Sequence, residues 1–127
     1  MKTHITFTHA PIIPPALELG GHEIGASLEF SGIVRETEND KKISGLFYEA
    51  YEPMAQKKLS EILEQLAARC PCEDVWFIHR LGFVPVGEAS LFIRILSRHR
   101  QASLRLMAEL IDRLKADVPV WKQSAPG

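Results

Sequence analysis

An apolar segment that runs directly into an amphipathic one constrains this chain more than any other feature. Residues 89–97 carry large aliphatic and aromatic side chains at both odd and even positions, which is typical of a strand covered on both faces. From Arg100 to Asp117, apolar residues then recur at spacings of four and three, namely Leu104, Met107, Ile111 and Leu114. The two segments predict a central strand followed by a helix that packs against its sheet.

Cations flank both ends of this expected helix. His99 and Arg100 begin it, Lys115 lies in its last turn, and Lys122 follows its end. At about 100° per residue, Arg100 falls within roughly 20° of Met107, so we expect its side chain on the apolar face. A guanidinium there needs a partner, since burying it unpaired is costly and helix N-termini favour anions. The pattern therefore predicts an anion site.

The other segments predict an α+β domain. Alternating patterns indicate strands at residues 3–9, 26–34, 43–51 and 75–81, and an apolar stripe indicates a first helix from Pro53 to Arg69. We expect irregular structure from Pro11 to Gly25, a mobile loop at 36–42, turns at Gly82 and at 85–87, and a frayed end at 123–127. Because the connections are short, the element order predicts one domain over residues 1–127 with a mostly antiparallel sheet.

Composition narrows the classes of function. Fifteen Lys and Arg residues nearly balance sixteen Asp and Glu residues, so no overall basic field favours nucleic acid. No apolar run is long enough to cross a membrane and no signal peptide begins the chain, which indicates a soluble, cytoplasmic protein. Cys70 and Cys72 are too close for an ordinary disulfide and predict two unreactive thiols in a turn. The five histidines lack metal-binding spacing, so we expect no metal site.

Several ordered strings cover nearly all of the chain after Gly25. The strings are Phe30-Ser31-Gly32-Ile33-Val34-Arg35, Tyr48-Glu49-Ala50-Tyr51-Glu52-Pro53-Met54-Ala55, His79-Arg80-Leu81-Gly82, Pro85-Val86-Gly87-Glu88, Ser97-Arg98-His99-Arg100, Leu114-Lys115 and Val118-Pro119-Val120-Trp121-Lys122. In this order they resemble one family, the large, catalytic subunits of molybdopterin synthase.

This resemblance implies an α/β-hammerhead fold with two main helices and a specific reaction. Sulfur would pass from the C-terminal thiocarboxylate of a small ubiquitin-like carrier to cyclic pyranopterin monophosphate, giving the dithiolene of molybdopterin. It implies a homodimer within a heterotetramer and no metal or organic cofactor. Lys115 and Lys122 would be catalytic, and the substrate would be bound by Arg35, His99 and Arg100 together with Ile33 and Val34.

Several residues also have simpler interpretations. Considered by itself, Lys115 is an ordinary lysine that the helix dipole favours near a C-terminus. Lys122 follows Trp121, so its ammonium group could instead make a cation–π contact with the indole ring. We expect His79 and Arg80 to have structural or interface roles, because adjacent strand positions point to opposite faces. The family usually continues beyond the Trp-Lys pair with more charged residues than the 123–127 segment carries. An alternative is therefore a catalytically weakened homologue that only binds the carrier.

Overall fold

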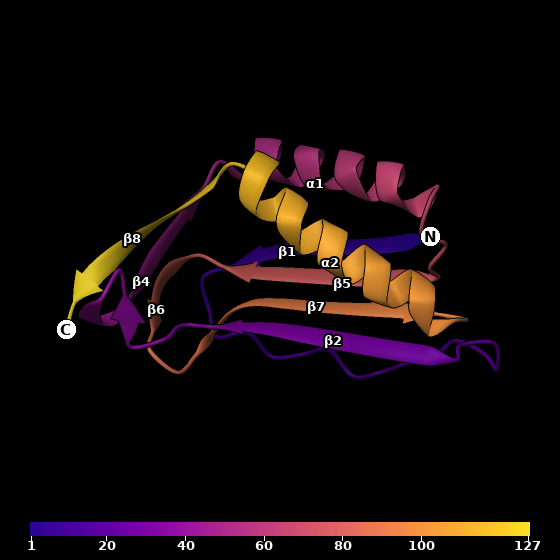
Figure 1. Cartoon of the computed structure of the whole chain (residues 1–127), viewed down its shortest axis with the longest axis horizontal. Helices are drawn as coiled ribbons and strands as arrows, with labels where there is room; N and C mark the ends of the chain where they lie inside the picture. The colour runs from indigo at the N-terminus through magenta and orange to yellow at the C-terminus, as the bar shows by residue number, and fades with distance from the viewer.

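The chain forms two sheets, one beyond the end of the other, in a computed structural model that describes all residues from 1 to 127 (Figure 1). In chain order the elements are β1 (Lys2–Thr8), β2 (Ala26–Ile33), β3 (Thr37–Glu38), β4 (Lys41–Ala50), α1 (Glu52–Ala67), β5 (Asp74–Arg80), β6 (Gly82–Pro85), β7 (Ala89–Ser97), α2 (Arg100–Asp117) and β8 (Val120–Pro126). The expected α+β architecture with two main helices is confirmed.

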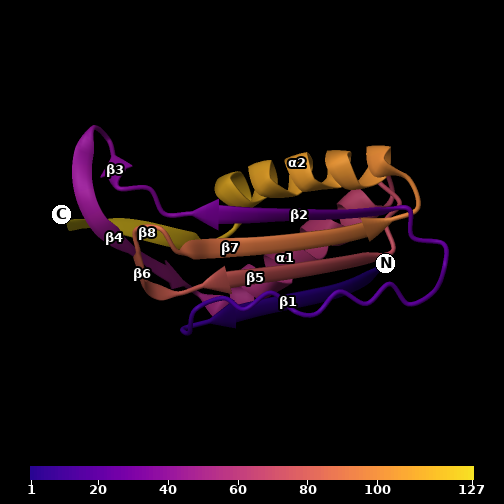
Figure 2. The ribbon, with the colours of Figure 1, turned by 90° about the horizontal axis from the view of Figure 1, so that it is seen from below.

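The larger sheet has the strand order β1-β5-β7-β2. Strand β5 is parallel to β1 and antiparallel to β7, which is itself antiparallel to β2. The prediction for β7 is confirmed, since it lies between two strands and is buried at nearly every position. Strand β2 forms one edge of this sheet, which leaves its outer backbone groups without a neighbouring strand in the chain (Figure 2).

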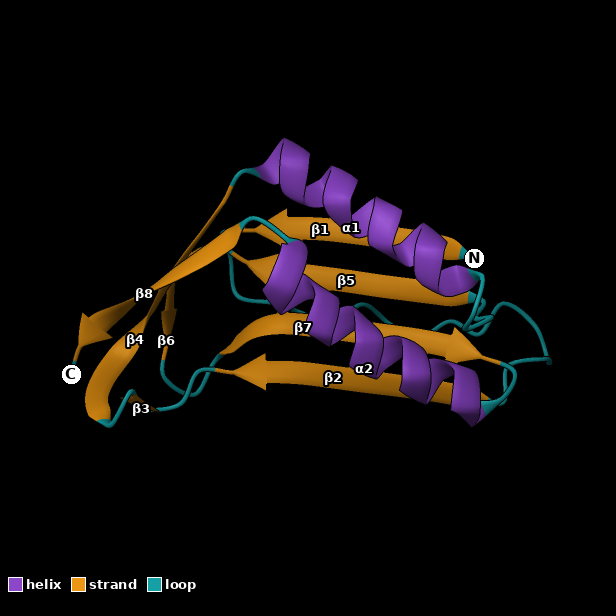
Figure 3. Ribbon diagram, turned by 45° about the horizontal axis from the view of Figure 1, so that its top comes forward, coloured by secondary structure: helices purple, strands orange, loops and turns teal.

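Both helices cover one face of the larger sheet, and the main core lies between them and the strands (Figure 3). The fully buried side chains include Leu59 and Leu66 of α1, Phe77 of β5, Ile93 of β7 and Leu110 of α2. Neither helix combines the length and the apolar character that a membrane span needs.

The prediction of which face of α2 is buried was wrong by part of a helical turn. The helix buries Ser103, Leu106, Met107, Leu110 and Leu114, whereas Leu104 is 53% exposed and Arg100 is exposed. The centre of the buried stripe is rotated by about 60° from the expected one. The sequence carries two overlapping apolar stripes, and packing against the sheet selects the one with Leu106 and Leu110.

An irregular segment covers the opposite face of the sheet. Residues 9–25 contain no helix or strand, as the prolines predicted, and run back along the strands (Figure 2). Arg94 is buried beneath this segment, where its Nη1 donates to the Pro15 carbonyl at 2.7 Å and its Nε donates to Glu29 at 2.8 Å. One buried guanidinium thus fastens the segment to β7 and β2.

The smaller sheet contains three strands that the sequence analysis missed. Residues 36–42 form a hairpin of β3 and β4 rather than a loop, and its tip, Asn39-Asp40, has positive φ angles of 51° and 63°. Strand β6 fills the space between the two expected turns and pairs with β4. The end expected to fray is instead β8, which pairs with β4 from Val120 to Pro126.

Candidate active site

A cleft of about 530 Å³ opens where the two sheets meet the end of α2. Its lining comes from the end of β2 and the segment after it, from β4, β5 and β7, and from the last turns of α2 and the start of β8. Ten of its 17 lining residues are hydrophobic, so the wall suits a flat ring system as well as a charged group. The apolar wall includes Phe30, Ile33, Val34, Leu46, Leu91, Ile111, Leu114 and Trp121.

Three of the predicted cations line this cleft. Arg35 follows β2, Lys115 lies in the last turn of α2, and Lys122 lies in β8, so three separate segments supply them. The only carboxylate in the lining is Glu38, whose Oε1 lies 3.3 Å from Lys122 Nζ. Three cations facing one carboxylate give the cleft a net positive charge, which favours an anionic ligand.

The backbone before Arg35 is held firmly. Val34 is buried, its N–H donates to the Glu88 carbonyl at 3.0 Å, and its carbonyl accepts from the Gly87 N–H at 2.8 Å. Ile33 is 52% exposed and contributes apolar surface to the cleft. Arg35 therefore extends into the cleft from a fixed backbone position although its own side chain is exposed.

His99 and Arg100 do not join these residues within one chain. They lie at the N-terminal end of α2, fifteen residues before Lys115, which corresponds to about 22 Å along a helix. Both are exposed, so the expectation of a buried Arg100 and of one pocket shared by all five cations is wrong for the single chain. The cause is geometric, since the two ends of a straight helix cannot meet.

His79 also lines the cleft, although the sequence analysis assigned it a structural or interface role. It lies in β5, is only 4% exposed, and packs edge to face against the ring of Tyr48 with 5.0 Å between centroids. Burial lowers the pKa of His79 below its usual 6.5, an effect opposed by its backbone hydrogen bond to Arg80. The alternation of β5 contained the signal, because His79 shares the core-facing side with Phe77.

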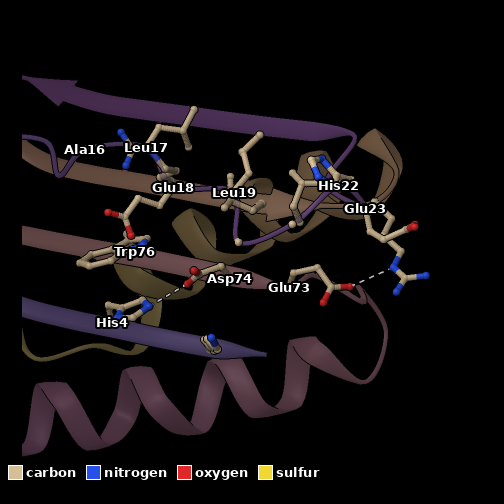
Figure 4. A pocket seen from close by; sticks show the side chains of 17 residues that line it. His4, Ala16, Leu17, Glu18, Leu19, His22, Glu23, Glu73, Asp74 and Trp76 are labelled. Carbon is tan, nitrogen blue, oxygen red and sulfur yellow. Dashed lines mark ion pairs between the residues drawn. The ribbon is translucent and has the colours of Figure 1, made fainter.

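A second cleft, of about 430 Å³, lies under the irregular segment on the other face of the sheet (Figure 4). Cations and carboxylates are mixed in its lining, and two pairs of them are in contact: His4 Nε2 lies 2.9 Å from Asp74 Oδ1, and Arg98 Nε lies 3.5 Å from Glu73 Oε1. His4 also stacks on Trp76 at 3.8 Å. This mixture does not present charge of one sign, so the first cleft is the better candidate.

The two cysteines lie in the turn after α1 and are both buried and unpaired, as expected. Burial raises the pKa of the Cys70 thiol and raises that of Cys72 to about 11. Both groups are therefore protonated and poor nucleophiles near neutral pH. No three His, Cys, Asp or Glu side chains lie close enough together to hold a metal ion.

Comparisons with known proteins agree with the motifs. The family model described as "MoaE protein" matches residues 7–117. Curated relatives include a human molybdopterin synthase catalytic subunit, 43% identical over 99 residues, covering 78% of this chain and 53% of that protein. Molybdopterin synthase catalytic subunit 1 of Aedes aegypti is 45% identical over 108 residues, covering 84% and 70%. The chain thus spans about half the length of the human relative.

Solved structures match over most of the fold. The molybdopterin synthase structure from Staphylococcus aureus superposes with a TM-score of 0.84 at 31% identity, covering 95% of this chain and 90% of that one. A complex of subunits 1 and 2 of molybdopterin-converting factor from Helicobacter pylori matches with a TM-score of 0.69 at 26% identity, covering 80% and 66%. The chain therefore belongs to the MoaE protein family, the family of the molybdopterin synthase catalytic subunits.

Proposed function

We propose that this chain is the catalytic subunit of a molybdopterin synthase. In this reaction, sulfur from the C-terminal thiocarboxylate of a small ubiquitin-like carrier is transferred, twice, to cyclic pyranopterin monophosphate to form the dithiolene of molybdopterin. The observation that carries the proposal is the meeting of Arg35, Lys115 and Lys122 in one cleft with an apolar wall. The family membership supports it independently.

The cleft has groups suited to each part of that substrate. The guanidinium of Arg35 can make paired, charge-assisted hydrogen bonds to a phosphate. Lys115 and Lys122 can stabilise negative charge as the sulfur attacks and the acyl group of the carrier leaves, and one of them can transfer a proton. The apolar wall would cover the ring of the pterin, and holding carrier and pterin together supplies the proximity that the reaction needs.

The proposal also indicates where the tail of the carrier would bind. In the Helicobacter pylori structure, subunits 1 and 2 of molybdopterin-converting factor form a complex. In this chain a flexible glycine tail could reach Lys122 from the solvent side, because the lysine is more than half exposed. We expect the tail to displace Glu38 from Lys122 or to lie beside that pair.

A second copy of the chain can complete the site with His99 and Arg100. Edge strand β2 lies beside α2, and the two elements run toward the same end of the molecule (Figure 3). Antiparallel pairing of two β2 edges about a two-fold axis would set the two α2 helices in opposite directions. The partner subunit's Arg100 would then lie near Lys115 of the first chain, and exposed Phe30 and Leu104 would be covered.

A single-turnover assay with the thiocarboxylated carrier and the pyranopterin substrate tests the proposal. We expect dithiolene product from the wild-type chain and at least a hundredfold slower turnover from Lys122→Ala, in line with the loss of a group that stabilises charge in the transition state. Lys57→Ala, on the exposed surface of α1, is the matched control. Folded protein that binds the carrier but gives no product would instead support the weakened homologue.

A further inference from the structure

His79 is a buried titratable group in the cleft to which the proposed reaction gives no role. Its side chain belongs to the sheet face that carries Phe77, and the rings of Phe7, Phe77 and Tyr48 surround it. It lines the same cleft as Arg35, Lys115 and Lys122. A buried polar side chain in such surroundings normally satisfies its hydrogen bonds within the protein.

One ring nitrogen of His79 is satisfied, and this fixes the tautomer. Nδ1 lies 2.8 Å from the carbonyl oxygen of Arg80. Since a carbonyl only accepts, Nδ1 must carry the hydrogen and donate it. Burial keeps the ring neutral by lowering its pKa. The other nitrogen, Nε2, is therefore unprotonated and can only accept a hydrogen bond.

Nε2 has no donor within the chain. It takes part in none of the side-chain hydrogen bonds, yet it is not among the side-chain atoms that are sealed from solvent without a hydrogen-bond partner. The remaining access to this nearly buried ring is the cleft that it lines. The lining of the cleft thus contains this acceptor nitrogen together with the donors Arg35, Lys115 and Lys122.

We propose that Nε2 of His79 accepts a hydrogen bond from a neutral N–H group of the ligand that fills the cleft. This inference rests on the proposed function and adds a specificity-determining contact to it. Leu91 pairs with His79 across β5 and β7, and Leu46 lines the same cleft. Apolar surroundings strengthen such a contact and disfavour a charged donor such as an ammonium group. Two groups in the reaction carry neutral N–H donors, namely the pterin ring and the amides of the glycine tail.

Two substitutions separate the free nitrogen from the anchored one. His79→Asn keeps an amide donor near the position of Nδ1 and removes the acceptor at Nε2. His79→Gln places an amide oxygen near the position of Nε2 and gives up the donor to Arg80. A merely structural histidine predicts that Asn is the better replacement, whereas the proposed contact predicts that Gln is.

The measurement is the Kd of each variant for cyclic pyranopterin monophosphate alone and for the carrier alone. We expect His79→Asn to weaken binding of one of the two by about tenfold, the loss of one hydrogen bond, and His79→Gln to restore most of it. The affected ligand identifies the source of the N–H. Wild-type affinity of His79→Asn for both ligands, or better binding by Asn than by Gln, would overturn the inference while leaving the proposed function intact.

A measurement on the unaltered chain guards against misfolded variants. In protein labelled with ¹⁵N at histidine, Nε2 of His79 should show the shift of an unprotonated ring nitrogen, and saturating ligand should move it upfield. An unchanged resonance at saturation with both ligands would refute the contact. If the wild-type chain bound neither ligand, the proposed function would fall as well, so the two failures differ in what the wild type does.

Discussion

Lys122 Nζ lies 3.3 Å from Glu38 Oε1, and this ion pair joins β8 to the β3–β4 hairpin beside the cleft. Lys122 is 54% exposed and Glu38 is 22% exposed at the side chain. A pair this accessible to water contributes little to stability. We expect the pair to affect ligand binding instead, because Glu38 is paired with the ammonium group that a phosphate or a thiocarboxylate would have to approach.

Glu38→Gln should therefore strengthen binding of the pyranopterin monophosphate. Removing the competing carboxylate should lower the Kd by about two- to fivefold, the range expected from an exposed ion pair. Titration calorimetry at low salt measures the effect, with Glu36→Gln as the control, since Glu36 is exposed and makes no ion pair. Equal affinities of the two variants would show that Glu38 does not compete for the site.

Mixing two inactive variants tests whether a second copy completes the site. Lys115→Ala removes a group from one end of α2, and Arg100→Ala removes one from the other end. In a dimer with shared sites, each mixed dimer contains one site with both residues intact. An equimolar mixture that exchanges subunits should thus recover about a quarter of wild-type turnover, although each variant alone is nearly inactive.

The mixture must be compared with each variant alone at the same total concentration, before and after subunit exchange. Recovery that grows with the time of exchange supports the shared site. Activity no higher than the mean of the two separate variants would mean that Arg100 does not act in the neighbouring subunit.

Local patterns predicted the elements that bury a continuous apolar stripe. Strand β7 and helix α2 were placed at their observed limits, because the continuous apolar run of β7 and the helical spacing of α2 reflect the side chains that each element buries. Strands β3, β6 and β8 of the smaller sheet left no such signal. Strand β8 buries only Ala125, and what holds it is its backbone pairing with β4. That pairing depends on a distant segment, so no local pattern in residues 120–126 could reveal it.

The residues of the candidate site also differ in how well local patterns predicted them. Arg35, Lys115 and Lys122 were predicted together and lie in one cleft, while their chemical roles stay predictions. Arg100 was misplaced because the sequence holds two apolar stripes on α2, and only the sheet beneath decides which is buried. His79 was assigned a structural or interface role because adjacent strand positions point to opposite faces. The cleft beside it is completed by β8, a strand that the sequence did not predict.

Gly45 should be essential to the smaller sheet. A Cβ at this position would lie 2.5 Å from the Val84 carbonyl oxygen and 2.6 Å from the ring of Phe83 on β6. Gly45→Ala should therefore lower the free energy of unfolding by about 1–3 kcal/mol, the usual cost of overpacking. Gly32→Ala is the control, because its Cβ would meet Leu91 at an ordinary 3.4 Å. Equal urea midpoints for the two variants would contradict this account of the β4–β6 contact.

The buried imidazole of His79 should make the fold sensitive to acid. Burial lowers its pKa in the folded chain below the usual 6.5, so below that pH the unfolded chain binds the proton more readily. Stability from this group is complete above pH 6.5 and is lost as the pH falls through the folded-state pKa, with a slope of at most about 1.4 kcal/mol per pH unit.

The variant His79→Asn tests this prediction, because asparagine has no side chain that titrates in this pH range. Urea denaturation of both proteins between pH 7.5 and about pH 5 should thus give a steeper acid loss for the wild type, because the carboxylates common to both cancel in the difference. Parallel curves would mean that burial does not lower the pKa of this imidazole in the folded chain.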